Sequence, residues 1–153
     1  MLSEIHIAAP AKINLGLNVL PRRKDGFHSI ESIFQAVSLK DELFVALDDG
    51  FGKCSVSCDG LVLPEENTVT AAYKAFGAAA GIQPLSVRVK LVKKIPSGGG
   101  LGGGSSDAAF FVRALEKLHG VTLTEEQLDF IAARVGSDVF FFFHCDDDGT
   151  GAA

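Results

Sequence analysis

A run of glycines in the middle of the chain limits what this sequence can form more than any other feature. Six of the seven residues 98–104 are glycine, and Pro96 precedes the run. Residues 85–92 alternate between apolar and polar side chains, which predicts a strand before it. Residues 105–107, Ser-Ser-Asp, are preferred helix N-caps and begin a predicted helix that ends before Gly120. A loop without side chains at a helix N-terminus lets main-chain N–H groups approach an anion, so the sequence predicts a phosphate site.

Three interpretations of this loop compete. A flexible linker is disfavoured because Leu101 interrupts the glycines and N-cap residues follow directly. The spacing G-x-G-x-x-G over residues 98–103 matches a dinucleotide-binding fingerprint, but any dense glycine run produces that match. The preceding strand also alternates, whereas that fold begins with a buried strand. A Walker A loop needs a lysine before Ser105, where this chain has Gly104. We therefore favour a nucleotide triphosphate loop of a non-Walker kind, with its cation supplied by a metal ion or a distant lysine.

Alternating side chains predict several strands. In residues 85–92 the inward positions are Leu85, Val87, Val89 and Leu91, and the outward ones are Ser86, Arg88 and Lys90. In residues 11–20 one face carries Ile13, Leu15, Leu17 and Val19, and the other carries Lys12, Asn14, Gly16 and Asn18. Residues 42–47 and 54–58 predict two strands that can pair with each other, whereas residues 29–40 fit a strand or a helix. The apolar run 138–143 predicts a final strand.

Capping signals predict two further helices. Asn67 or Thr68 begins one that ends before Gly81, and Thr124 with Gln127 forms a capping box for a helix that ends at Gly136. Alternating strands indicate a sheet with one open face, because strands covered on both faces are apolar throughout. The predicted fold is α+β, with a mixed sheet and helices on one face.

Composition excludes several classes of protein. The chain has 153 residues, 47% of them hydrophobic, which is typical of one soluble domain. A net charge of -5 argues against a general nucleic-acid binder. The longest apolar runs are too short for a membrane span, and the N-terminus lacks signal-peptide features. The odd cysteine count, without metal-ligand spacing, favours reduced thiols and a cytoplasmic location. A metal site at residues 144–146 (His-Cys-Asp) is disfavoured because a strand would separate neighbouring side chains.

Four motifs, in order between residues 9 and 143, resemble the GHMP kinases. The segment PSGGGLGGGSSDAA resembles the P-x-x-x-G-L-G-S-S-A-A motif of that family. The segments PAKINLGL, RRKDGFHSIESIFQ and GSDVFFF narrow the resemblance to its members that phosphorylate 4-diphosphocytidyl-2-C-methyl-D-erythritol, on the way to isoprenoid precursors. The resemblance implies the N-terminal domain fold of this family, with a ribosomal-protein-type βαβ arrangement.

The resemblance also implies an activity and a catalytic pair. The activity is ATP-dependent phosphorylation of a hydroxyl group on a small-molecule cytidine-diphosphate conjugate. Asp138 would orient or deprotonate that hydroxyl, and Lys12 would keep Asp138 ionised and offset charge on the transferred phosphoryl group. Mg²⁺ is expected with ATP because no Walker lysine neutralises the phosphates, although no protein ligand for it is assigned.

Further positions are carried over from the family's binding sites. Asn14 matches a substrate contact, and Phe27 and His28 match the positions that recognise cytosine by stacking and hydrogen bonding. Asn67 and Lys93 match positions near the adenine. The ATP phosphate loop is matched by Pro96, Ser97, Gly98, Gly99, Gly100, Leu101, Gly102, Gly103, Gly104, Ser105 and Ser106.

The chain departs from the family pattern in three respects. Phe27 often stands as Tyr in the family, and Phe140 replaces a proline, but the aromatic ring and Asp138 are retained. Family members are nearly twice as long, with a second domain that nothing in residues 1–153 matches, so we expect the N-terminal, ATP-binding domain. The residues 149–151 (Gly-Thr-Gly) faintly resemble a glycine motif of that second domain. The alternatives are a homoserine- or mevalonate-type kinase of the same family, or a non-catalytic nucleotide-binding fragment that needs a partner chain.

Overall fold

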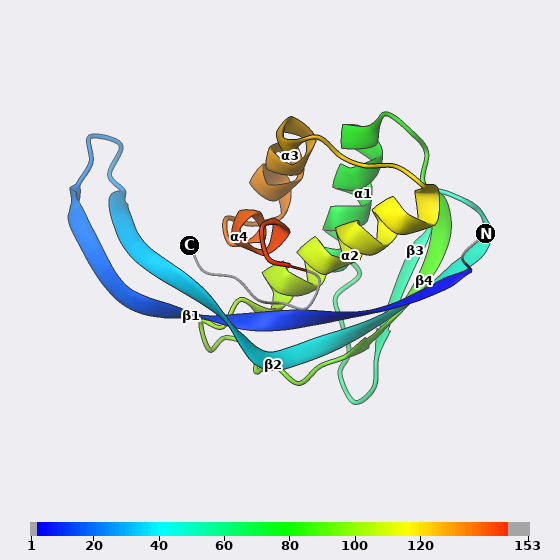
Figure 1. Cartoon of the computed structure of the whole chain (residues 1–153), viewed down its shortest axis with the longest axis horizontal. Coiled ribbons are helices and arrows are strands. Elements are labelled where there is room, and N and C mark those ends of the chain that lie inside the picture. The colour runs from blue at the N-terminus through cyan, green and yellow to red at the C-terminus, as the bar shows by residue number, and fades with distance from the viewer. Residues whose placement is uncertain (1–2, 147–153) are drawn as a thin grey trace.

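A four-stranded sheet with helices on one face forms the body of the protein (Figure 1). The computed structural model describes residues 3–146, so the resemblance at residues 149–151 lies outside the described residues. The strands are β1 (Glu4–Arg22), β2 (His28–Phe51), β3 (Cys54–Cys58) and β4 (Leu85–Val92). The helices are α1 (Thr68–Ala80), α2 (Gly103–His119), α3 (Glu125–Val135) and α4 (Val139–Phe143). The predicted α+β class with helices on one face is confirmed.

The strand order is β1-β2-β4-β3. The first three strands in this order are antiparallel neighbours, whereas β3 runs parallel to β4 and is joined to it through α1. This connection is the expected βαβ unit. The predicted pairing of residues 54–58 with residues 42–47 is wrong, because β4 lies between them and pairs with both. Alternation indicates that a segment is a strand but carries no information about its neighbour.

The core lies between the sheet and α1 and α2. Val87, Val89 and Leu91 of β4 are buried as predicted, and Arg88 and Lys90 are exposed. Ser86 was predicted to face outward but is buried, where its hydroxyl accepts a hydrogen bond from the Lys53 N–H at 3.3 Å. Across the sheet, residues of β1 and β2 such as Ile7, Leu43 and Val45 complete the apolar layer. None of the helices in residues 3–146 has the length and apolar character needed to cross a membrane.

The helix ends show where capping chemistry predicts structure. Asn67 caps α1 and Thr124 caps α3, each through a reciprocal capping box, and Gly81 follows α1 in the left-handed conformation. Helix α2 begins two residues before the predicted Ser-Ser-Asp cap, because Gly102 takes the N-cap position with φ of 70°. Residues 105–107 therefore lie within the first two turns of α2. Ser106 and Asp107 are buried there rather than turned back to cap the helix.

The predicted strand at residues 138–143 is wrong, because residues 139–143 form the short helix α4. Val139, Phe141, Phe142 and Phe143 are buried in this helix, and only Phe140 faces solvent. A short run of apolar residues fits a buried strand and a buried helix equally well, because neither leaves an alternating pattern. Packing of the helix against α2 and α3 selects between the two.

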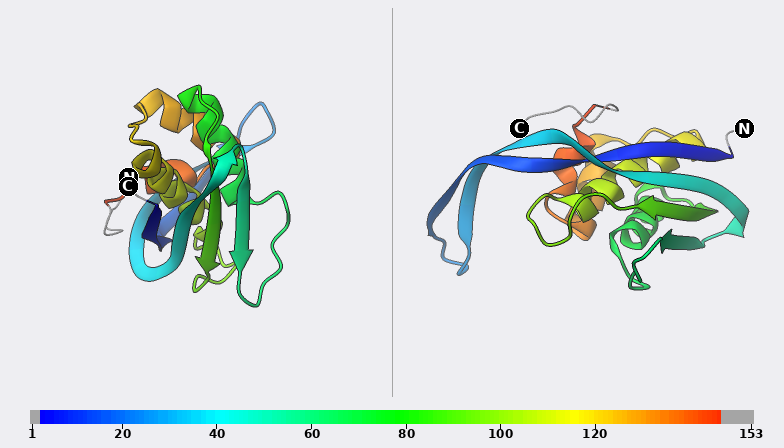
Figure 2. Two further views of the ribbon diagram at one scale, coloured as in Figure 1. Left: turned by 90° about the vertical axis from the view of Figure 1, so that its right-hand side faces the viewer. Right: turned by 90° about the horizontal axis from the view of Figure 1, so that it is seen from below.

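The second half of β1 and the first quarter of β2 leave the body as a two-stranded ribbon, formed by residues 13–22 and 28–33 and the turn between them (Figures 1 and 2). Residues 29–40, which fit either element, are strand. In the ribbon both faces of β1 are exposed, including Leu15, Leu17 and Val19 of the apolar face, whereas Lys12 at its base is only 5% exposed. A bulge between Asn14 and Leu17 adds one residue to β1, and Leu17 consequently shares a face with Asn14.

Candidate active site

The glycine loop forms a pocket of about 290 Å³ between the end of β4 and the N-terminus of α2. Its lining is almost entirely main chain, consisting of Thr68, Lys93, Pro96, Ser97, Gly98, Gly100, Leu101, Gly102, Gly103, Gly104 and Ser105. Free N–H groups of the first turn of α2 lie at this pocket, together with the positive end of the helix dipole. This arrangement suits a chain of phosphates.

The glycines are required by backbone conformation and by space. Gly98, Gly100 and Gly102 all have positive φ angles, between 70° and 76°, which side chains disfavour. At Gly102, a Cβ atom would lie 3.1 Å from the ring of Phe142 and 3.3 Å from Cε of Lys12. Close packing here brings the loop against β1 and α4, and the Lys12 N–H donates to the Leu101 carbonyl at 2.9 Å.

Lys12 and Asp138, predicted as the catalytic pair, meet beside the loop. Their Nζ and Oδ2 atoms lie 3.7 Å apart. The ammonium group of Lys12 also donates to Oδ1 of Asn14 at 2.7 Å and lies 4.4 Å from the centre of the Phe34 ring. The expected shared face of Lys12 and Asn14 is confirmed, and the body of the protein shields this cation from water. Asp138 is partly exposed, so its carboxylate can be reached from solvent.

A second pocket, of about 560 Å³, opens on the other side of this pair. It is lined by Lys12, Asn14, Leu17, Ile30, Ser32, Phe34, Ser137, Asp138, Phe140, Phe141 and His144. Asn14 donates to Oγ of Ser32 at 2.9 Å. A chain of polar contacts therefore runs from Asp138 through Lys12 and Asn14 to Ser32. Lys12 packs against Gly102 on one side and lines this pocket on the other. The two pockets share no lining residue, but they adjoin at Lys12, which lines the second pocket and packs against Gly102 of the first. A transfer between two bound molecules requires such neighbouring sites.

The predicted cytosine-binding residues lie away from this pair. Phe27 is 72% exposed in the turn of the ribbon, and His28 begins β2 with Nδ1 2.9 Å from the Leu20 carbonyl. Neither residue lines the second pocket, although Leu17 and Ile30 of the ribbon do. An acceptor that contacts Phe27 and Asp138 together must extend along the ribbon.

The residues predicted near adenine are both engaged. Oδ1 of Asn67 accepts hydrogen bonds from the N–H groups of Val69 and Thr70 in the capping box. Asn67 does not line the loop pocket, whereas its neighbour Thr68 does. Lys93 lines that pocket, but its ammonium group is paired with two carboxylates, those of Asp41 and Asp107.

Sequence reasoning missed several residues of the second pocket. Ser32, Phe34, Ser137 and His144 line it, and none belongs to a motif with a chemical signature of its own. Ser32 and Phe34 are brought in by the pairing of β2 with β1, and Ser137 and His144 flank α4. Only the structure reveals them, because their positions depend on the pairing of β2 with β1 and on the helix α4, which forms where a strand was predicted.

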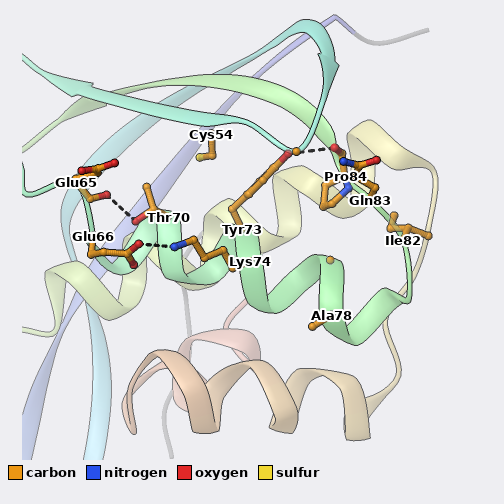
Figure 3. Close-up of a pocket in the computed structure, with 12 residues that line it drawn as sticks. Cys54, Glu65, Glu66, Thr70, Tyr73, Lys74, Ala78, Ile82, Gln83 and Pro84 are labelled. Atoms are coloured by element: carbon orange, nitrogen blue, oxygen red, sulfur yellow. Dashed lines mark hydrogen bonds and ion pairs between the residues drawn. The ribbon is translucent and has the colours of Figure 1, made fainter.

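A third pocket, of about 550 Å³, lies along α1 and is lined by other residues (Figure 3). Its charged groups include Glu66 and Lys74, which pair with each other, and Tyr73 donates its hydroxyl to the Pro84 carbonyl at 3.1 Å. Burial raises the pKa of the Cys54 thiol to about 12, so this group stays protonated and unreactive. The pocket contains no arrangement of nucleophile and base, and all three cysteines of the chain are free.

The donor groups near the loop suit a nucleotide-borne metal ion better than a resident one. Within residues 3–146, His, Cys, Asp and Glu side chains form no cluster of three that could hold an ion. Asp138 supplies one partly exposed oxygen donor beside Lys12, whereas the hydroxyl of Ser106 is fully buried and does not line the loop pocket. Mg²⁺ commonly takes one or two protein ligands with phosphates and waters, and this donor set fits that mode.

Comparison with known proteins places the chain in a family. The sequence profile of the GHMP kinases N terminal domain matches residues 67–146, just over half of the chain. The chain therefore belongs to the GHMP kinase family.

Two curated relatives carry the same name. The chain is 45% identical over 141 residues to 4-diphosphocytidyl-2-C-methyl-D-erythritol kinase of Treponema pallidum, a match that covers 92% of this chain and 48% of the relative. It is 40% identical over 143 residues to the enzyme of the same name from Fusobacterium nucleatum, with 92% and 49% covered. The chain spans about half the length of these curated relatives.

Solved structures agree with the fold. A crystal structure of 4-(cytidine 5'-diphospho)-2C-methyl-D-erythritol kinase matches with a TM-score of 0.75 and 39% identity, over 91% of this chain and 48% of that one. The mevalonate kinase of Methanococcus jannaschii matches with a TM-score of 0.67 at 15% identity, over 98% of this chain and 52% of its own, which shows a shared fold alone.

Proposed function

We propose that this chain is the N-terminal, ATP-binding domain of a kinase that phosphorylates a hydroxyl group of 4-diphosphocytidyl-2-C-methyl-D-erythritol. The observation that carries the proposal is that Lys12, paired with Asp138 in the second pocket, packs directly against Gly102 of the glycine loop. The proposed substrate is the one named for relatives that are 40–45% identical to this chain. The donor is ATP with Mg²⁺, and the site of action is the cytoplasm.

In the proposed reaction, the glycine loop and the N-terminus of α2 hold the phosphates through main-chain N–H groups. Asp138 accepts a hydrogen bond from the acceptor hydroxyl and takes its proton as the oxygen attacks the γ-phosphorus. The bond between the γ-phosphorus and the β–γ bridging oxygen breaks, and ADP leaves with that oxygen. Lys12, 3.7 Å from Asp138, offsets negative charge on the phosphoryl group in transit. Mg²⁺ bound to the nucleotide would neutralise further phosphate charge.

The acceptor binds in the second pocket under this proposal. Asn14 and Ser32 offer hydrogen bonds to its sugar-like hydroxyls, while Phe34 and Phe141 supply apolar walls. The cytosine would extend along the ribbon to Phe27, where an exposed aromatic ring can stack on a base. His28 would hydrogen-bond the base edge. Asn67, through its neighbour Thr68, and Lys93 would border the adenine end of the loop pocket, but the Lys93 ammonium group is paired with Asp41 and Asp107 and would not bind the base.

A phosphoryl-transfer assay on the full-length gene product tests this proposal. Labelled phosphate from [γ-³²P]ATP should appear on 4-diphosphocytidyl-2-C-methyl-D-erythritol and not on homoserine or mevalonate. Transfer to homoserine or mevalonate instead would assign a different acceptor within the family. ATP binding without transfer to any of the three would show a nucleotide-binding domain without the proposed activity.

A further inference from the structure

Three charged side chains lie together beneath the phosphate loop. Lys93 directly follows β4, and its Nζ lies 2.5 Å from Oδ2 of Asp41 and 2.8 Å from Oδ2 of Asp107. Asp41 belongs to β2 and is completely buried, and Asp107, the fifth residue of α2, is only 2% exposed. Charges this deeply buried are costly unless they are paired, so the arrangement depends on all three groups.

Asp41 fixes the segment that enters the loop. Its Oδ1 accepts the N–H of Lys94 at 2.6 Å and that of Ile95 at 2.8 Å, immediately before Pro96. Each bond is strengthened by the charge of the carboxylate. The main chain that leads into the glycines is thereby tied to the middle of the sheet.

Asp107 fixes the segment that leaves the loop, through Lys93. Asp107 lies one residue after Ser106, whose N–H donates to the Gly102 carbonyl at 2.9 Å and closes the first turn of α2. A Cβ atom on Gly103 would lie only 3.2 Å from the Lys93 ammonium nitrogen. One lysine side chain consequently connects the entry and the exit of the same loop.

We propose that Lys93 is a positioning residue that clamps the two ends of the phosphate loop together by bridging Asp41 and Asp107. A loop with glycines at positive φ has many accessible conformations, and ordering it on nucleotide binding would cost conformational entropy. The clamp removes part of that cost in advance, which favours phosphate binding. The identity of the nucleotide in this inference rests on the proposed function, but the clamp itself does not.

The ionisation of Asp107 in the clamp is expected to make nucleotide affinity depend on pH. One lysine faces two carboxylates, and Oδ1 of Asp107 is buried without a hydrogen-bond partner. Burial raises the pKa of Asp107 to about 7, an effect that Lys93 opposes and the nearby Asp41 adds to. A triphosphate in the loop favours the neutral form of Asp107 further, so nucleotide affinity should fall as pH rises through 7.

Two variants test the clamp in the full-length gene product. Lys93→Met with Asp107→Asn removes the bridge, while Asp41 keeps its two main-chain donors. Asp107→Asn alone removes the titrating group but keeps the volume and an oxygen acceptor for Lys93. Lys94→Met is the matched control, because the Lys94 ammonium group pairs at 3.2 Å with the partly exposed Glu42 and with no other carboxylate among residues 3–146.

Hydrogen exchange and calorimetry provide separate measurements. In the double variant the amides of Ile95 and Ser106 should exchange about tenfold faster, and ATP should bind about tenfold more weakly, with adenosine affinity unchanged. Asp107→Asn should abolish a loss of ATP affinity of about fivefold that the wild type shows between pH 6 and 8. The Lys94→Met control should match the wild type in each measurement.

Each alternative result has a distinct meaning. An equal loss of ATP and adenosine affinity in the double variant would make Lys93 an adenosine ligand and overturn the clamp. Unchanged exchange at Ile95 and Ser106 would also overturn it, as would identical pH profiles for the wild type and Asp107→Asn. Faster exchange in a protein that binds no ATP would support the clamp while refuting the proposed function.

Discussion

The strands β1 and β2 cross two environments, and the contrast between them explains much of this molecule. In the body, Ile7 pairs with Leu43, and both are buried beneath the helices. In the ribbon, Val19 pairs with Ile30, and both are more than half exposed. The same two strands, with similarly apolar residues, are core in one half and surface in the other. Helix coverage, rather than strand sequence, decides which side chains are buried.

The site lies where these two environments meet. Lys12 is the last buried residue of β1 before the ribbon, and Asp138 precedes α4 in the body. The body supplies a water-shielded cation, and the ribbon supplies an open wall along which the proposed acceptor would extend. A transfer enzyme needs both, because the reacting groups must be fixed while the acceptor must enter and leave.

The largest effect is expected at this junction. Asp138→Asn should lower kcat by about 10²- to 10⁴-fold, because the amide cannot accept the hydroxyl proton. ATP affinity should stay within about twofold, since the phosphates are held by main chain. Steady-state kinetics with nucleotide-binding calorimetry measures both quantities. The control is Asp129→Asn on the exposed face of α3, and a matching loss there or a parallel loss of ATP affinity would contradict the role of Asp138.

The contrast in burial predicts a large difference between two leucines. Leu43→Ala in the body should lower the free energy of unfolding by about 2–5 kcal/mol, because it leaves a cavity in the core. Leu17→Ala in the ribbon, where the side chain is 61% exposed, should cost below about 0.5 kcal/mol. Urea denaturation compares the two. Similar losses would show that the ribbon is covered in solution.

A smaller effect is expected at the tip of the ribbon. Phe27→Ala should weaken binding of the cytidine substrate by about 1–3 kcal/mol, the value of a lost base stack. The free energy of unfolding should not change, because the ring is exposed. Substrate titration at saturating ATP measures the first and denaturation the second. An unchanged substrate affinity would remove Phe27 from the proposed cytosine site.

The smallest effect concerns the bulge. Gly16 has φ of 103°, and a Cβ atom there would meet open space, so Gly16→Ala should cost about 1 kcal/mol through backbone strain alone. Thermal unfolding measures this loss. No loss at all would indicate that the strand slips to a regular register, and substrate affinity should then fall because Leu17 leaves the pocket face.

The glycine loop and the capping signals could be predicted from sequence because they depend on local chemistry. Positive φ at Gly98 and Gly100 and the capping boxes at Asn67 and Thr124 follow from residue type and spacing. The exposure of the ribbon, the pairing of β3 with β4 and the helical state of α4 could not be predicted, because each depends on packing against a segment far away in sequence. The pairing of Lys12 with Asp138 could be predicted only from the family resemblance, because no local pattern relates residues so far apart in the chain.

The most direct test is a crystal structure of the full-length gene product with a non-hydrolysable ATP analogue and the acceptor. The account predicts phosphates over Gly98 to Gly104, with the γ-phosphate between Lys12 and the acceptor hydroxyl and that hydroxyl within hydrogen-bond reach of Asp138. A nucleotide seated instead in the pocket along α1, or a γ-phosphate directed away from Asp138, would contradict it.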